Sequence, residues 1–254
     1  ILTTAGWMEC PAGTLIVDGS AFSSTMTVKS GATLAGSGTI GTTTIMNGGT
    51  FAPGPVGAIG SMTVAGNLTF QSGASYQVLV DPTHASSANV TANQATLAGN
   101  VLATFAPGSY ITKQYTILSA SSIDGAFDNL STKNLPAGFT ANLSYGASDV
   151  YLNLTATLGA PSPSSPPSLA RATLVDNAES GAKAINGYFN SGGALPANYL
   201  PLFGLTGSSL ANALMQLSGE AATGAQQSAF RLTNLYLALM LDPLTAAVCC
   251  PAEI

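Results

Sequence analysis

The sequence predicts a mainly β protein whose short strands stack as a repeating coil, followed by a small α-helical segment. A short motif recurs, consisting of Gly, a small polar residue and an apolar residue. It stands at Gly13-Thr14-Leu15, Gly31-Ala32-Thr33-Leu34, Gly49-Thr50-Phe51, Gly66-Asn67-Leu68 and Gly99-Asn100-Val101. The first four apolar positions are 19, 17 and 17 residues apart (34−15, 51−34 and 68−51). A near-constant period with one glycine turn and one strand per repeat is typical of a stacked β-coil.

Residues 13–109 are expected to form this repeating stem. Apolar and polar residues alternate along short stretches, as in strands with one buried face. These stretches are Met62-Thr63-Val64, Asn67-Leu68-Thr69-Phe70 and Tyr76-Gln77-Val78-Leu79-Val80. Turn residues such as Asn47-Gly48-Gly49 and Pro53-Gly54-Pro55 separate them. Residues 1–12, which hold the only tryptophan, are expected to be an irregular start.

Residues 110–158 are expected to form a β cap. The glycine motif stops after about Tyr110, and an alternating stretch follows at Tyr115-Thr116-Ile117-Leu118. Residues 139–145 and 150–154, joined by Gly146-Ala147-Ser148-Asp149, have the pattern of a β-hairpin. A stacked coil exposes the edges of its last strands, which invites aggregation unless they are covered.

The remaining residues change to helical spacing. Residues 159–167 are rich in Pro and Ser and are expected to be an extended linker. Residues 168–243 are expected to form amphipathic helices, with Ser168 as an N-cap and Gly192-Gly193 as a helix end. A short helix is expected from Ser208 or Ser209 to Leu217. The apolar stripes are Val175, Ala178, Ala182, Ile185 and Phe189, and then Ala225, Ala229, Leu232, Tyr236 and Leu239. Residues 244–254 are expected to form an irregular tail.

The composition excludes several classes of protein. Only 7% of the residues are charged, against about 25% in an ordinary globular protein. Hydrophobic residues make up 46%, which argues against a disordered chain. The net charge of −5 and the six Lys and Arg residues exclude a nucleic-acid footprint and attraction to anionic membranes.

The cysteines and the single histidine do not form a site in the sequence. Cys10, Cys249 and Cys250 are too few and too unevenly spaced for a disulfide framework. His84 is far from all three, so we expect neither zinc nor any other metal site. It follows Asp81-Pro82 and is interpreted as a solvated loop residue.

The carboxylates give a weak case for catalysis. Between residues 13 and 158 the acidic residues are Asp18, Asp81, Asp124, Asp128 and Asp149, with no Glu. Glycosidic cleavage needs paired carboxylates at a fixed separation. Asp124 and Asp128 are the only close pair, and we interpret them as turn residues. Asp18-Gly19-Ser20 lacks the nucleophile elbow of a serine hydrolase, so no catalytic residue is expected.

Other short motifs have ordinary structural explanations. Gly36-Ser37-Gly38 is followed by neither Lys-Ser/Thr nor a helix, so no phosphate or dinucleotide cofactor is expected. The calcium-binding nonapeptide is absent. Asn-x-Ser/Thr triplets occur at Asn67, Asn89, Asn129, Asn142 and Asn153, as a Thr-rich alternating strand produces by chance.

Three groups of residues, in their order along the chain, resemble bacterial autotransporters. Residues 31–41, 47–54 and 62–68 are similar to the passenger-associated repeat of these type V secretion proteins. Tyr115-Thr116-Ile117-Leu118-Ser119-Ala120, with residues 143–145 and 150–152, resembles their autochaperone region. Gln216-Leu217-Ser218-Gly219-Glu220 resembles the helical stretch before their translocator barrel. The resemblance covers about residues 13–243.

This resemblance implies a right-handed parallel β-helix (solenoid) with a β cap and a helical linker. It implies a non-catalytic stem that presents material at the bacterial cell surface or in secreted form and assists its export. The partner it implies is an outer-membrane translocator barrel, expected C-terminal of these residues and not within them. Two alternatives stay open, namely an adhesin or carbohydrate-binding module that takes surface glycans, and a β-helix polysaccharide lyase or hydrolase.

Overall fold

The computed structural model describes the chain except for residues 1–5, 56, 160–168, 219–229 and 238–254. The chain divides into two compact units. One comprises Ile1–Gly159 and Lys183–Gly204, and the other comprises Ala160–Ala182 and Leu205–Ile254. The predicted linker at 159–167, Ser168 and the tail at 244–254 thus lie almost wholly outside the described residues.

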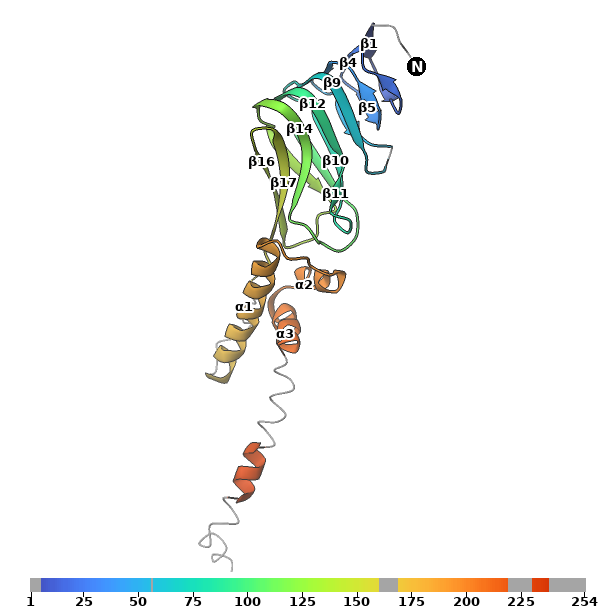
Figure 1. Cartoon of the computed structure of the whole chain (residues 1–254). Coiled ribbons are helices and arrows are strands. Elements are labelled where there is room, and N and C mark those ends of the chain that lie inside the picture. Colours follow the sequence, from blue (N-terminus) through green and yellow to red (C-terminus); the bar gives the residue numbers. More distant parts are fainter. Residues whose placement is uncertain (1–5, 56, 160–168, 219–229, 238–254) are drawn as a thin grey trace, which may run out of the picture. The chain divides into compact units, whose positions relative to one another are not determined.

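Two sheets make up the strand-rich unit, and the chain passes back and forth between them (Figure 1). In the ten-stranded sheet lie β1 (Trp7–Cys10), β3 (Ser20–Ala21), β4 (Thr25–Val28), β6 (Thr39–Ile40), β7 (Thr43–Ile45), β9 (Ser61–Phe70), β12 (Asn89–Leu97), β14 (Gln114–Gly125), β16 (Phe139–Tyr145) and β17 (Asp149–Ala156). In the seven-stranded sheet lie β2 (Gly13–Ile16), β5 (Ala32–Gly36), β8 (Thr50–Pro53), β10 (Ser75–Asp81), β11 (Ser86–Ser87), β13 (Asn100–Phe105) and β15 (Asn129–Lys133). Pairing is parallel except where β11, β16 and β17 join. A mainly β fold with parallel strands is confirmed.

The repeated motif forms a ladder of apolar side chains inside the seven-stranded sheet. Leu15 pairs with Leu34 and Leu34 pairs with Phe51, as the motif spacing predicts. The ladder continues in the same register through Tyr76, Val101 and Leu130. Its four middle members are fully buried. Burying one such side chain contributes about 1.5–3 kcal/mol, so this ladder is a major source of stability.

The fourth motif, Gly66-Asn67-Leu68, does not belong to this ladder. Leu68 lies in β9 of the ten-stranded sheet, where it pairs with Thr43 and Ala95. The position opposite Phe51 is taken by Tyr76, which follows Gly73-Ala74-Ser75. The turn after Pro53 and the ten-residue strand β9 lengthen the chain between β8 and β10, so the interval grows to 25 residues (76−51 and 101−76). The prediction of a near-constant period is therefore wrong beyond Phe51.

The ten-stranded sheet carries its own buried ladder, through Cys10, Val28, Ile45 and Phe70. One polar residue, Thr43, also points inward and is fully buried. Its hydroxyl donates to the carbonyl of Gly41 at 2.9 Å, so its polar group is satisfied.

The expected irregular start at residues 1–12 contains a strand. β1 pairs in parallel with β4, from Trp7 opposite Thr25 to Cys10 opposite Val28. The amide of Lys29 donates to the carbonyl of Cys10 at 3.0 Å, and its ammonium pairs with Glu9 at 2.6 Å. This segment alternates too briefly to be identified from sequence, and its strand conformation is fixed by pairing with β4.

The predicted hairpin is confirmed. The strands lengthen before Tyr110, at β9 with 10 residues and β12 with 9, whereas β15 after it has 5. β16 pairs antiparallel with β17, from Phe139 opposite Ala156 to Tyr145 opposite Val150. β17 also pairs antiparallel with β14. Between the two sheets, Phe51 of β8, Phe70 of β9 and Tyr76 of β10 form an aromatic cluster with Phe127, with ring centroids 5.3–5.9 Å apart. The Tyr76 hydroxyl donates to the carbonyl of Ile117, and burial raises its pKa.

The helical segment contains α1 (Leu169–Asn190), the 3-10 turn η1 (Ala197–Tyr199), α2 (Leu200–Phe203) and α3 (Gly207–Leu217). The end predicted for α1 is confirmed, because Gly192 has φ +104° and its amide donates to Phe189. The predicted short helix to Leu217 is confirmed as α3. Of the second stripe, Leu232 and Tyr236 lie in helical residues 230–237, and Ala225, Ala229 and Leu239 lie outside the described residues. None of the helices in the described ranges has the length and apolarity needed to cross a bilayer.

Candidate functional site

The most elaborate polar arrangement in the strand-rich unit lies where residues 183–204 pack against the end of β17. We call this arrangement the closure and define it as Asn186, Asn190 and the aromatic residues Phe105, Tyr110, Phe139, Phe189 and Phe203. Asn186, Phe189 and Asn190 lie in α1 and Phe203 in α2. Phe105 ends β13, Tyr110 follows it, and Phe139 begins β16.

Two asparagine amides of α1 complete the hydrogen bonding of β17. Upstream, the amide of Leu154 donates to the backbone carbonyl of Lys113, just before β14 begins. Two residues later, Ala156 donates to Asn190 Oδ1 at 2.9 Å and accepts from Asn190 Nδ2 at 3.0 Å. Two residues later again, Leu158 donates to Asn186 Oδ1 at 2.7 Å and accepts from Asn186 Nδ2 at 3.2 Å. The side-chain amides therefore take the place of a neighbouring strand.

The spacing of the two asparagines explains why this works. Residues four apart lie on one face of a helix, and residues two apart lie on one edge of a strand. An amide offers both a donor and an acceptor, so each asparagine matches one residue of the strand edge. Buried backbone groups that lack partners are costly, so these bonds stabilise the end of β17.

The aromatic residues of the closure form a continuous cluster around Phe139. The Phe139 ring lies 4.7 Å from Tyr110, 5.4 Å from Phe189 and 4.6 Å from Phe203, measured between centroids. Tyr110 also stacks on Phe105 at 6.4 Å. Such pairs add about 0.5–1.5 kcal/mol each beyond the burial of their area. All five rings are buried, so they seal this end of the unit's interior.

Backbone contacts hold the same segment in place. Tyr110 and Leu195 form an antiparallel bridge, with N–O distances of 3.0 and 2.7 Å. The Lys113 ammonium donates to the carbonyl of Asn190 at 2.6 Å, where a cation also favours the helix C-terminus. Residues 183–204 are thus attached to the strands through main-chain, amide and aromatic contacts together.

Two tyrosines near the closure have buried hydroxyls without a hydrogen-bond partner, Tyr110 and Tyr115. Burial raises the pKa of both phenols. The neighbouring Tyr115 raises the pKa of Tyr110 further, and Asp81 does the same for Tyr115. Both therefore stay neutral and cannot serve as bases near neutral pH.

Three of the predicted aspartates act as acceptors for neighbouring strands and turns. Asp18 accepts from the amide and hydroxyl of Ser37 at 3.0 and 3.2 Å. Asp128 accepts from the amide of Gly99 at 2.8 Å. Asp149 accepts from the hydroxyls of Ser119, Ser148 and Tyr151 at 2.6, 3.1 and 3.3 Å. Hydrogen bonding, above all from Ser119, lowers the pKa of Asp149. Asp124 is exposed in β14, opposite Thr96 of β12.

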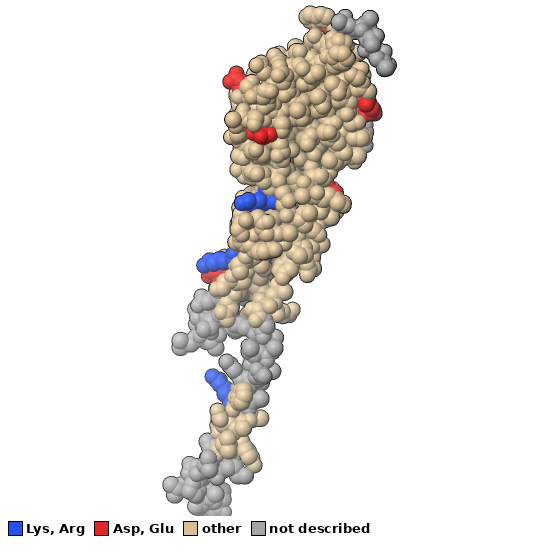
Figure 2. Space-filling view, in the orientation of Figure 1, with Lys and Arg blue, Asp and Glu red and all other residues tan. Residues whose placement is uncertain are grey.

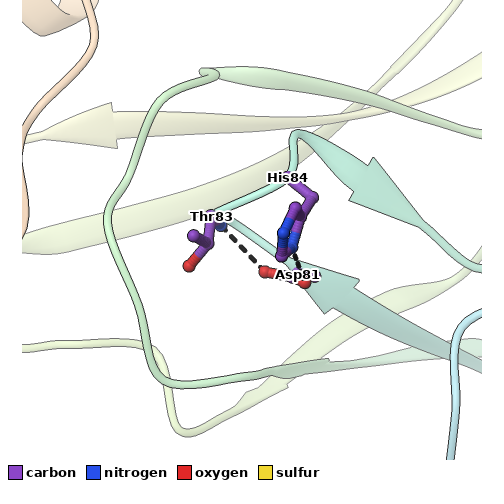
Figure 3. Close-up of polar contacts among 3 residues, drawn as sticks. All are labelled: Asp81, Thr83 and His84. Atoms are coloured by element: carbon purple, nitrogen blue, oxygen red, sulfur yellow. Dashed lines mark hydrogen bonds and ion pairs between the residues drawn. The ribbon is translucent and has the colours of Figure 1, made fainter.

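Asp81 and His84 form an exposed pair in the turn between β10 and β11 (Figure 3). His84 Nδ1 lies 2.6 Å from Asp81 Oδ2, and the amide of Thr83 donates to Asp81 Oδ1 at 2.9 Å. The hydrogen bond to His84 is the main reason why the pKa of Asp81 is lowered. The His84 side chain is 77% exposed, as a solvated loop residue should be. Ser20 lies in β3, opposite Thr39, and not in this turn.

Gly36-Ser37-Gly38 has a packing role. A Cβ on Gly36 would lie 2.2 Å from the carbonyl oxygen of Val17, and one on Gly38 would lie 2.1 Å from that of Gly19. These glycines therefore allow one turn of the stack to lie directly on the previous one.

The described residues contain no cluster of three or more His, Cys, Asp or Glu side chains that could hold a metal ion. Cys10 is a free, buried thiol, whereas Cys249 and Cys250 lie outside the described residues. On the face drawn in Figure 2, the described surface carries few charged side chains, and no large patch of one sign is seen.

A shallow groove of about 260 Å³ lies over the seven-stranded sheet beside the turn after Pro53. Alanines, prolines and Leu79 line it together with uncharged Thr33, Gln77 and Thr104. It offers no acid, base or nucleophile for chemistry.

The sequence did not reveal Asn186 and Asn190 as structural ligands of a strand. The available signal was their spacing of four residues on a helix that follows the second strand of the predicted hairpin. No family model matches this sequence, and no curated protein matches it.

Proposed function

We propose that this chain is a non-catalytic stem and folding cap of an autotransporter-like surface protein. In this proposal the two sheets are faces of a right-handed parallel β-helix, with residues 110–158 as its β cap. The observation that carries it is the single register of apolar side chains from Leu15 to Leu130, whose four middle members are fully buried. A stack that repeats in register is an extendable spacer, and covering its last strands prevents edge-to-edge association.

The aspartates support a structural role. Asp18, Asp128 and Asp149 are each occupied as acceptors between neighbouring turns of the chain. A glycosidase needs two carboxylates facing one bond across a few ångströms. The aspartates instead come from different turns and strand ends, and each stabilises the place where it stands.

The proposed partner is an outer-membrane translocator barrel joined C-terminal to these residues, and the proposed location is the bacterial cell surface or the medium. Folding of the cap would help to draw the chain outward. The closure suits this role because it joins residues 183–204 to the strands, so it can form only once both are present.

The test is surface display in a Gram-negative bacterium. The full chain, with an N-terminal epitope, is joined to a translocator barrel, and the epitope is measured by antibody and protease accessibility on intact cells. We expect display of the unchanged chain, a several-fold loss for Asn186→Ala with Asn190→Ala, and no loss for Asn212→Ala, an exposed asparagine of α3. Absence of display, or equal display by all three, would contradict the proposal. Release of reducing sugar from polysaccharides by the purified chain would favour the hydrolase instead.

A further inference from the structure

The outer side of the ten-stranded sheet carries rows of threonine in register. One row consists of Thr27, Thr44, Thr69 and Thr96, which lie opposite one another on β4, β7, β9 and β12. It continues into Glu9 at one end and Asp124 at the other. The four threonines point outward, because both neighbours of each along its strand are buried.

A second row lies on the other side of the register shift in β9. It consists of Ser20, Thr39, Thr63, Thr91 and Ser119. We call the two rows together the threonine face. All the residues of both rows that lie between their ends carry a hydroxyl. No charged or aromatic side chain interrupts either row there.

The geometry of parallel strands makes this face a lattice. Neighbouring strands are about 4.8 Å apart, so hydroxyl and methyl groups repeat at that distance along each row. Threonine is stiff at χ1, and neighbours in the row restrict it further, so little side-chain entropy is lost on binding. Ordered groups at a fixed repeat favour a ligand that is itself periodic.

The chemistry of the face narrows the choice of ligand. Polysaccharide recognition in water relies on aromatic platforms, and neither row has one. A mineral surface would need rows of charge, which are also absent between the ends of the rows. A protein interface would need a buried aromatic or apolar core. Ice presents periodic oxygens whose spacing in the basal plane is close to that of paired strands, and hydroxyls with methyls suit it.

We propose that the threonine face binds ice. One hydroxyl gains almost nothing by exchanging liquid water for ice, because both offer hydrogen bonds. Many groups held at the repeat of the crystal act together, so adsorption depends on the whole array. This activity is separate from the proposed role as stem and cap, and either can fail alone.

The seven-stranded sheet supplies a matched control. Its outer row is Thr14, Thr33, Thr50, Ser75, Asn100 and Asn129, so hydroxyls stop at Ser75 and amides replace them on the last two strands. The next outward row includes Ile16, Ala35 and Ala52, and the turn after Pro53 stands beside it. That face is neither uniform nor open, so it should not bind ice.

The experiment measures ice-crystal shaping and thermal hysteresis with the full chain, together with its partition into a slowly growing ice hemisphere. We expect faceted crystals and enrichment in ice for the unchanged chain and for Thr50→Tyr. We expect loss of both for Thr69→Tyr, which places a bulky side chain in the middle of the face. Circular dichroism and thermal unfolding establish that both variants are folded.

Three results would overturn the proposal. The first is an unchanged chain that leaves ice crystals unshaped up to its solubility limit. The second is equal behaviour of folded Thr69→Tyr and Thr50→Tyr. The third is sedimentation with insoluble polysaccharide that Thr69→Tyr abolishes while ice is ignored, which would assign the face to glycan.

Discussion

At the residue scale, Gly138 shows how one missing side chain permits the closure. Its φ is +76°, and a Cβ there would lie 2.7 Å from Cδ1 and 3.2 Å from Cβ of Phe203. Gly138→Ala should therefore combine backbone strain with displacement of a buried ring, and we expect a loss of about 2–4 kcal/mol in the free energy of unfolding. Gly57→Ala is the matched control, with φ +76° and nothing within 4 Å of the new Cβ, and should cost about 1 kcal/mol. Denaturant titration of both variants measures the difference, and equal losses would remove the contact with Phe203 from the explanation.

Asp149 gives a pH dependence at the same scale. Its hydrogen bonds from Ser119, Ser148 and Tyr151 lower its pKa in the folded chain. A carboxyl with a lowered folded pKa stabilises the fold above its unfolded pKa of about 3.9, and that contribution is lost as the pH falls through the folded value. Asp149→Asn should therefore destabilise the chain by a constant amount near pH 7, and this difference should shrink below about pH 4. A difference that persisted unchanged to pH 2 would refute the assignment.

At the element scale, the asparagines of α1 act as a substitute strand beside β17. Asn190→Leu keeps the size of the side chain but leaves the amide and carbonyl of Ala156 without partners, at a cost of about 1–3 kcal/mol. Hydrogen exchange should then accelerate at Ala156 more than at Leu154, whose amide is held by Lys113. Asn212→Leu, on the exposed side of α3, should change neither quantity. If exchange at Ala156 stayed slow, the amide of Asn190 would not be its essential partner.

The elements also show what the sequence could and could not predict. Alternation predicted β10 and β17 because every second residue in each is buried. In β9 the alternation breaks at Ala65-Gly66-Asn67, and in β16 only Phe139 is buried, so those strands were predicted from shorter alternating stretches. The stacking order was predictable only from Leu15 to Phe51. The same Gly-polar-apolar pattern occurs at Leu68 in the other sheet, and local sequence does not distinguish the two. β1 and the asparagines of the closure depend on partners distant in the chain, which a local pattern cannot contain.

At the scale of the whole molecule, the proposed stack of turns would have nearest-neighbour stability, so its ends would determine whether it stays separate from other chains. At the end marked by β16 and β17, residues 183–204 bind the end of β17, cover the Phe139 ring and lie in one compact unit with the strands. The strand ladders and the closure are therefore parts of one folding unit, although the sequence pattern changes from β to helical between them.

Truncation tests this dependence directly. A chain ending at Gly159 retains every strand but lacks Phe189, Phe203, Asn186 and Asn190, so Tyr110 and Phe139 lose the rings that cover them. We expect it to bind a hydrophobic dye, to unfold at a lower denaturant concentration and to associate as its concentration rises. A chain ending at Gly204 keeps the closure and should unfold like the full chain. If the two truncations showed the same stability and the same dye binding, the strands would be self-sufficient, and residues 183–204 would be a passive extension of the stack.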